Sequence, residues 1–223
     1  LIVPWNFPIG MIAKKLSAAL AAGCASVIKP ASKTPLTMIA LFALLEREVR
    51  LPAGWANLVP GSASAIADAL LTHPDVAVVS FTGSTEVGRE LITKSAAQVK
   101  RITLELGGNA PYIVFADADM DKAVDQLMAN KFRGSGQTCV CANRILVERP
   151  VAAEFSRRLT ARVNALRLGD GLDDATDIGP LVDRAGYEKV RHHLIDAMAK
   201  GAQLVTGAPA GALPQLDKEW GGF

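Results

Sequence analysis

The chain has 223 residues, half of them apolar, and a formal net charge of +2. This apolar content allows a substantial core in one large or two small domains, and the small charge argues against nucleic acid or an anionic membrane as partner. No apolar run is long enough to span a bilayer, and the three cysteines lack disulfide-framework spacing. We therefore expect a globular, cytoplasmic protein.

Strand and helix patterns alternate through the first part of the chain. Short β-branched runs predict strands, and Ala- and Leu-rich stretches closed by Gly or Pro predict helices. The expected strands are 1–3, 25–29, 55–59, 76–82 and 101–105, and the expected helices are 9–22, 35–48 (with Thr34 as N-cap), 62–71 and 86–98. The alternation predicts an α/β fold with a Rossmann-like parallel sheet and helices on both faces. Ligands of such sheets bind beyond the carboxyl ends of the strands.

The segment Leu106-Gly107-Gly108-Asn109 interrupts this alternation. We place a domain boundary here, between residues 1–106 and residues 107–223. The second region again mixes the two patterns, which predicts part of another α/β domain. Its expected strands are 111–115, 144–148 and 203–206, its expected helices are 120–132, 151–166 and 185–200, and 207–214 is expected to be a loop.

Cys139 lies in the segment Gly136-Gln137-Thr138-Cys139-Val140-Cys141, directly before an expected strand. A thiol at the end of a loop, held by rigid elements on both sides, suits a covalent nucleophile; a buried structural cysteine is the alternative. Cys141 is either a packed cysteine or the partner of Cys139 in a strained, easily reduced disulfide. Cys24 is expected in the core.

Three segments together resemble the aldehyde dehydrogenase superfamily. They are Pro4-Trp5-Asn6-Phe7-Pro8, Leu104-Glu105-Leu106-Gly107-Gly108-Asn109 and the Cys139 segment, in the family's order and spacing. The Cys139 segment is most similar to the NADP-dependent succinate-semialdehyde dehydrogenase branch, with glutarate-semialdehyde enzymes close behind. The resemblance covers essentially the whole chain, and it implies oxidation of a small-molecule aldehyde to the carboxylic acid.

The resemblance also implies catalytic roles. Cys139 would form a thiohemiacetal and then a thioester, the Asn6 amide and the Cys139 backbone amide would bind the oxyanion, and Glu105 would activate the hydrolytic water. We expect the apolar neighbours Leu104 and Leu106 to bury Glu105 and raise its pKa. Without the motif, an exposed strand-end charge is the simpler interpretation of Glu105, and a turn residue that of Asn6.

The coenzyme implied by the resemblance is NADP, with NAD possible. The expected contacts are Trp5, Asn6, Lys29, Pro30, Ala31, Ser32, Gly83, Ser84 and Leu106. Gly83-Ser84 opens a helix, where free backbone amides favour an anion. Family members that prefer NAD often carry Glu where Ser32 stands, and a neutral Ser32 near Lys29 and Lys33 favours the 2'-phosphate of NADP.

The resemblance also implies that Arg133 and Lys14 bind a distal substrate carboxylate; a solvated arginine at a helix end is the alternative for Arg133. The branch usually has Arg where this chain has Lys14, and Lys supplies charge without the bidentate fork. The sequence predicts no metal site. Family members are much longer, so we expect this chain to be truncated at both ends and its full-length form to be a homo-oligomer.

Two alternatives from other classes stay open. One is a truncated dinucleotide-binding module without turnover. The other is a cysteine-dependent hydrolase or acyltransferase, for which no histidine lies near Cys139 in sequence; the three histidines are His73, His192 and His193. A glutarate-semialdehyde or broad-range aldehyde dehydrogenase remains the alternative within the family.

Overall fold

A computed structural model describes residues 1–206 of the chain. The loop expected at 207–214 and the final Gly221-Gly222-Phe223 lie outside these residues. The chain divides into two compact units, one spanning Leu1–Gly107 (unit 1) and the other beginning at Gly108 (unit 2). Each unit is described by itself below.

Unit 1 is built on parallel strands. β1 (Ser26–Ile28) pairs with β2 (Ala56–Leu58), and β3 (Val78–Gly83) pairs with β4 (Arg101–Leu106), both in parallel register. The first three residues lie between these pairs, because Ile2 forms parallel bridges to both Lys29 and Phe81. The order across unit 1 is therefore β2, β1, the Ile2 segment, β3, β4, which confirms the predicted parallel sheet.

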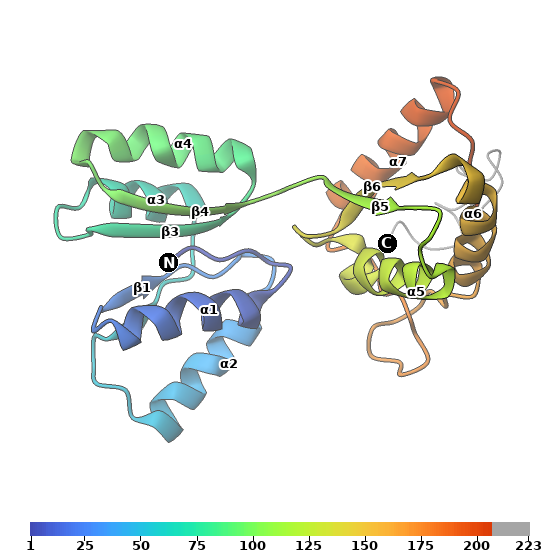
Figure 1. The fold of residues 1–223 in the computed structure, drawn as a ribbon. Coiled ribbons are helices and arrows are strands. Elements are labelled where there is room, and N and C mark those ends of the chain that lie inside the picture. The colour runs from blue at the N-terminus through green and yellow to red at the C-terminus, as the bar shows by residue number, and fades with distance from the viewer. Residues whose placement is uncertain (207–223) are drawn as a thin grey trace. The chain divides into compact units, whose positions relative to one another are not determined.

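Helices cover this sheet on both faces (Figure 1). Neighbouring side chains of a strand point to opposite faces, and the Ile2 segment shows the consequence directly. Ile2 packs in a cluster with Leu71 and Leu91, whereas Val3 packs in another with Ile12 and Met38. The helices that contribute to these clusters are α3 (Ala63–Thr72) and α4 (Thr85–Ser95) on the Ile2 face, and α1 (Pro8–Ala21) and α2 (Leu36–Leu44) on the Val3 face.

Capping explains where the helices begin. Ser62 and Ser84 are the N-caps of α3 and α4, and each side chain accepts a hydrogen bond from the backbone amide three residues on. The prediction of Thr34 as the N-cap of α2 is wrong: the N-cap is Pro35, and the Thr34 hydroxyl donates to the Trp5 carbonyl oxygen at 3.2 Å. Two helices change type at their ends: α2 continues as the π-helical segment η1 (Leu45–Val49), and α4 continues as the 3-10 segment η2 (Ala96–Gln98).

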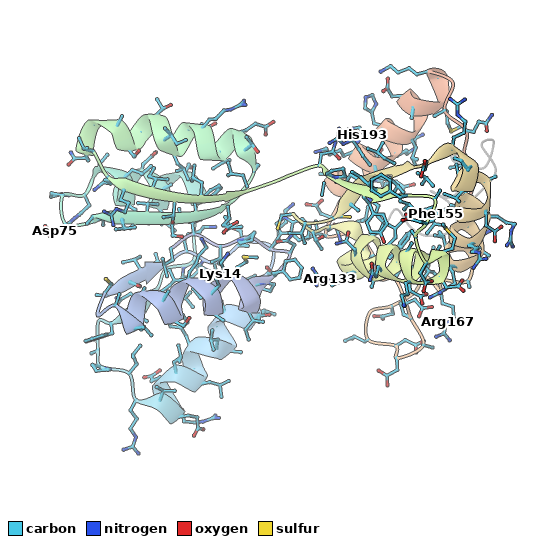
Figure 2. All side chains as sticks on the ribbon, viewed as in Figure 1. Lys14, Asp75, Arg133, Phe155, Arg167 and His193 are labelled. Atoms are coloured by element: carbon cyan, nitrogen blue, oxygen red, sulfur yellow. The ribbon has the colours of Figure 1, made fainter. Side chains whose placement is uncertain are left out.

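Unit 2 contains a parallel pair of strands with helices around it. Its elements are β5 (Ala110–Val114), α5 (Met120–Lys131), η3 (Arg133–Gly136), β6 (Ala142–Val147), α6 (Arg149–Asn164) and α7 (Arg184–Ala199). Val114, Leu127 and Phe155 form the centre of its core, with Phe155 only 2% exposed (Figure 2).

An ion-pair ladder joins α5 to α6. Arg158 contacts both Asp121 on α5 and Glu154 on its own helix, and Arg162 contacts Asp125. These pairs lie on the surface, so we expect each to contribute little to stability.

The strand predicted at 203–206 is wrong, because residues 202–205 form no regular structure. A short apolar run forms a strand only where it pairs with another strand. In the described part of unit 2, the extended pairing outside β5 and β6 is an isolated parallel bridge between Leu168 and Ile178. Within residues 1–206, the helices are too short or too polar to cross a bilayer.

Candidate active site

The predicted coenzyme contacts of unit 1 lie at one edge of its sheet. Asn6 follows the Ile2 segment, Lys29 follows β1, Gly83 ends β3 and Leu106 ends β4. Because these segments are parallel, their carboxyl ends meet at the same edge. The structure therefore brings the strand-end residues of four separate motifs to one side of unit 1.

Gly83 stands where a side chain does not fit. A Cβ at this position would lie 2.3 Å from Cζ of Phe81, whose ring is buried at 5% exposure. The next residue, Ser84, accepts a hydrogen bond from the Val87 amide at 3.3 Å and begins α4. Gly83 is thus required by the packing of Phe81, and the helix N-terminus that follows it suits an anion such as the phosphate of a dinucleotide.

The segment after β1 presents one buried cation. Lys29 is 4% exposed, its Nζ donates to Ser32 Oγ at 3.1 Å, and burial lowers its pKa. Pro30 is buried, Ala31 is half-buried and Ser32 is exposed. A cation that already contacts the Ser32 hydroxyl is placed to interact with an anion at this position.

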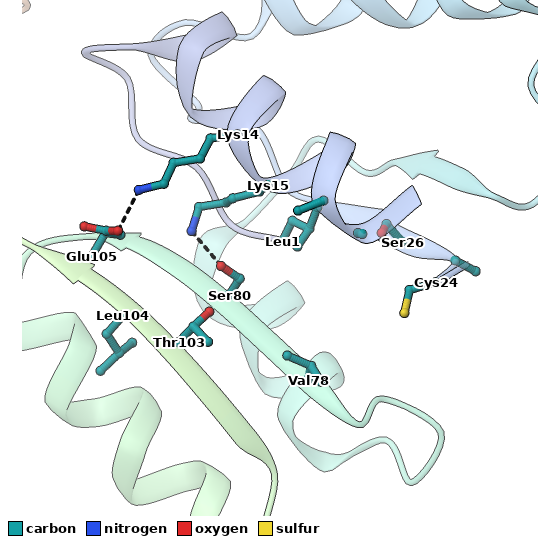
Figure 3. A pocket seen from close by; sticks show the side chains of 13 residues that line it. Leu1, Lys14, Lys15, Cys24, Ser26, Val78, Ser80, Thr103, Leu104 and Glu105 are labelled. Atoms are coloured by element: carbon teal, nitrogen blue, oxygen red, sulfur yellow. Dashed lines mark hydrogen bonds and ion pairs between the residues drawn. The ribbon is translucent and has the colours of Figure 1, made fainter. Parts of the chain in front are cut away.

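Glu105 is the second-last residue of β4, and Lys14 of α1 donates to its Oε1 at 2.8 Å (Figure 3). The Lys14 and Glu105 side chains are 64% and 56% exposed. The hydrogen bond from Lys14, with the charges of Lys14 and Lys15, holds the pKa of Glu105 below its usual value. The expectation that burial raises this pKa is therefore wrong: Leu104 and Leu106 do not enclose the carboxylate, and a cation reaches it from α1.

Lys15 and Ser80, which sequence reasoning missed, adjoin this pair. Lys15 Nζ donates to Ser80 Oγ at 2.6 Å, and burial lowers the Lys15 pKa. Both residues line a cavity of about 450 Å³ together with Lys14 and Glu105 (Figure 3). A sequence signal did exist, since Ser80 and Thr82 alternate with the buried Val79 and Phe81 and so give β3 one polar face.

In unit 2, Cys139 follows a tight loop. Gly134, Ser135 and Gly136 all have positive φ, at 57°, 56° and 74°, and a non-glycine residue held there needs support from its surroundings. Ser135 Oγ donates to the Gly179 carbonyl oxygen at 2.9 Å, and Gln137 Oε1 accepts from the Val182 amide at 3.0 Å. These bonds fix the loop on the segment before α7.

Asn130 fixes the other side of the same loop. Its Nδ2 donates to the Val140 carbonyl oxygen at 3.2 Å, and its Oδ1 accepts from the Ala142 amide at 2.7 Å. One amide side chain at the end of α5 thus satisfies backbone groups on both sides of Cys141. Periodicity gives no reason to single out Asn130, because its partners lie on an irregular loop.

The two neighbouring thiols have different environments. Cys139 is half-buried, whereas Cys141 is 1% exposed and its Sγ donates to the Lys131 carbonyl oxygen at 3.6 Å. Both are free, as is Cys24. Cys141 is thus packed in this structure, and its disulfide with Cys139 stays a prediction. The core placement of Cys24 is wrong: it is exposed, because it lies in the turn that links α1 to β1.

The predicted site residues divide between the units. Unit 1 holds Asn6, Lys14 and Glu105, with the last two in direct contact. Unit 2 holds Cys139 and Arg133, which is exposed and begins η3 six residues earlier. In the described range, no three His, Cys, Asp or Glu side chains group in a way that would hold a metal ion.

Comparison with known proteins defines the class. The chain matches the aldehyde dehydrogenase family over residues 1–220 and belongs to it. It is 52% identical to succinate-semialdehyde dehydrogenase [NADP(+)] GabD of Escherichia coli (strain K12) over 94% of this chain, and 49% identical to glutarate-semialdehyde dehydrogenase of Pseudomonas putida (strain KT2440) over 92%. Among solved structures, an oxidoreductase from Marinobacter aquaeolei matches 93% of this chain with a TM-score of 0.91 and 63% identity. The chain spans 43% of the length of each of these three proteins.

Proposed function

We propose that this chain is part of an NADP-linked dehydrogenase that oxidises a semialdehyde with a distal carboxylate, succinate semialdehyde first and glutarate semialdehyde second. The names of the similar enzymes from Escherichia coli and Pseudomonas putida support this substrate class. The observation that carries the proposal is the contrast between two thiols: Cys139 is partly accessible on a loop fixed by side-chain hydrogen bonds, whereas Cys141 is buried.

The proposed chemistry begins at Cys139. Its thiolate adds to the aldehyde carbon, which forms a C–S bond and places negative charge on the former carbonyl oxygen. The Asn6 amide and the Cys139 backbone amide are proposed to stabilise that oxyanion. A dinucleotide held at Lys29, Gly83 and Ser84 would accept the hydride that leaves the same carbon, so that a thioester would remain on Cys139.

Glu105 is proposed to act in the second half. A water molecule attacks the thioester carbon while Glu105 accepts a proton from it. The C–S bond then breaks, the carboxylic acid leaves and the Cys139 thiolate is regenerated. Glu105 does this only with its carboxylate accessible to water, and its 56% exposure meets that condition.

The coenzyme side of the proposal rests on Lys29 and Ser32. Lys29 would attract a 2'-phosphate, and the neighbouring Ser32 carries no charge to repel one, which supports NADP over NAD. Gly83 and Ser84 would hold the phosphates, and Trp5, Pro30, Ala31 and Leu106 would border the same edge.

The test is reduced-coenzyme absorbance with succinate semialdehyde, using the parent chain, Cys139→Ala and the matched control Cys24→Ala. We expect turnover in the parent and in Cys24→Ala, faster with NADP than with NAD, and a loss of about 10³-fold or more in Cys139→Ala because the covalent route is removed. Turnover that survives Cys139→Ala would contradict the proposal.

A parent chain that binds NADP by calorimetry but shows no turnover would favour the dinucleotide-binding module instead. Tighter binding of NAD than of NADP would contradict the coenzyme assignment alone.

A further inference from the structure

Lys14 and Glu105 have different expected tasks, the first from the family resemblance and the second in the proposed function, yet in this structure they bind each other. Lys14 is to hold the distal carboxylate of the substrate, and Glu105 is to accept a proton from water. At 2.8 Å, the Lys14 ammonium instead donates to a carboxylate of the protein itself. Lys14 is therefore bound to the proposed base, and the carboxylate of that base, Glu105, is bound to the proposed substrate-binding cation.

We propose that Lys14 is a carboxylate-exchange site, which Glu105 occupies in the free protein and from which the distal carboxylate of the substrate displaces it. Substrate binding then releases the base. This inference rests on the proposed function only for the identity of the incoming carboxylate.

The pair is suited to exchange because it is open to solvent. With side chains 64% and 56% exposed, both partners are already largely hydrated, so little further solvation changes when the contact opens, and exposed ion pairs of this kind contribute little net free energy. The incoming group is also a carboxylate, so the ammonium exchanges one acceptor for a like one. Lys carries three donors on a flexible stem and has no fixed fork to realign.

Lys15 cannot take over the role of Lys14. Its Nζ is bound to Ser80 Oγ at 2.6 Å, on the strand side of the cavity, and the side chain is half-buried (Figure 3). Figure 3 shows the two lysines directed at different partners, Lys14 at Glu105 and Lys15 at Ser80. Only Lys14 is therefore both exposed and in contact with the base.

Few charged groups face Glu105 within unit 1. From α1 these are Lys14 and Lys15, and the facing strand β3 contributes the uncharged Ser80 and Thr82. Departure of Lys14 therefore removes the largest cause of the low pKa of Glu105, and the released carboxylate becomes a stronger proton acceptor.

The experiment follows Glu105 directly. The complete chain is prepared with isotope-labelled glutamate, the Glu105 carboxyl signal is assigned with Glu105→Gln, and its NMR titration is recorded at constant ionic strength with and without succinate as the probe. Succinamide, which has the same carbon skeleton but no carboxylate, is the ligand control. We expect succinate, and not succinamide, to raise the pKa of Glu105 toward its usual value.

Variants separate exchange from general charge effects. Lys14→Met should raise the Glu105 pKa without any ligand, abolish its response to succinate and weaken succinate binding about two- to fivefold, the size expected for an exposed pair. Lys14→Arg should keep the response. Lys94→Met is the matched control, since Lys94 and Asp68 form a similarly exposed pair at 2.6 Å in the same unit, and it should leave both titrations unchanged.

An unchanged Glu105 titration in the presence of succinate overturns the exchange, whether succinate fails to bind or binds elsewhere. A response that persists in Lys14→Met overturns it as well. Failure of the proposed function would look different: turnover would be absent or independent of Cys139 while the succinate response of Glu105 stayed intact.

Discussion

Unit 1 carries its candidate site residues on strand ends, whereas unit 2 carries Cys139 on an irregular loop. In unit 1, parallel register sets the positions of Asn6, Lys29, Gly83 and Leu106. In unit 2, the loop before Cys139 contains three residues with positive φ and is fixed by side chains that bond to backbone groups.

The difference concerns which atoms determine a position. The position of a strand end is set by backbone hydrogen bonds, which depend little on the side chain. A single side chain therefore affects this position only where there is no room for it. A loop of this kind is placed by particular side chains, because the backbone groups find no ladder partners. We therefore expect the stability of unit 1 to fall when a side chain is enlarged at a strand end, and the stability of unit 2 to fall when a single side-chain amide is removed from the loop.

The largest effect is expected for Gly83→Ala in unit 1. The new Cβ would lie 2.3 Å from the buried Phe81 ring, and overpacking of this kind costs about 1–3 kcal/mol. Hydrogen exchange of the β3 amides measures the loss. Gly107→Ala is the control, since nothing lies within 4 Å of its Cβ position, and we expect it to be neutral or stabilising by up to about 1 kcal/mol. Equal losses in both variants would contradict the volume argument.

A smaller effect is expected for Asn130→Ala in unit 2. Two backbone groups lose their partner, which should lower the free energy of unfolding by about 1–2 kcal/mol and speed alkylation of Cys139 as the loop opens. The measurements are urea unfolding and the rate of iodoacetamide labelling. Asn143→Ala removes only one exposed contact with Lys131 and should cost less than about 0.5 kcal/mol. Unchanged labelling in Asn130→Ala would mean that the loop is held by other groups.

The smallest effect concerns pH and the ion-pair ladder of unit 2. Hydrogen bonds from Arg157 and Arg158 lower the pKa of Glu154 to about 2 from 4.5. A depressed carboxylate pKa stabilises the fold above the ordinary value, and this stabilisation is lost as pH falls through the lower one. The thermal midpoint of the parent should therefore fall more steeply between these two pH values than that of Glu154→Gln. Arg157 and Glu154 are 69% and 41% exposed, so the difference in thermal midpoint between the two proteins should be small. Parallel plots of thermal midpoint against pH would show that the ion pairs of Glu154 do not contribute to stability.

Local chemistry predicted much of the fold. The strand predicted at 76–82 corresponds to β3 (Val78–Gly83), and the helix predicted at 86–98 corresponds to α4 with η2. Each of these predictions rests on a pattern of neighbouring residues, so it is visible in the sequence. The meeting of strand ends then follows from parallel topology.

Contacts between distant residues were not predictable in this way. The low pKa of Glu105 depends on Lys14, which is 91 positions away. Thr34 donates to the carbonyl oxygen of the distant Trp5, and α2 has Pro35, not Thr34, at its N-cap. The role of Asn130 likewise depends on a loop conformation that has no period to detect.

The Ile2 segment has a consequence for the kinetics of folding. It lies between β1 and β3, where Ile2 donates to the Ser80 carbonyl oxygen at 2.8 Å and accepts from the Thr82 amide at 3.0 Å. During synthesis this segment precedes both neighbours, and its second neighbour, β3, follows only after the three helices α1, α2 and α3 and the two strands β1 and β2. Closing the long loop between Ile2 and β3 costs conformational entropy before their hydrogen bonds can offset that cost. The middle of the sheet thus waits for its second partner while several other elements are synthesised, so its apolar side chains stay exposed to chaperones and to aggregation during that time.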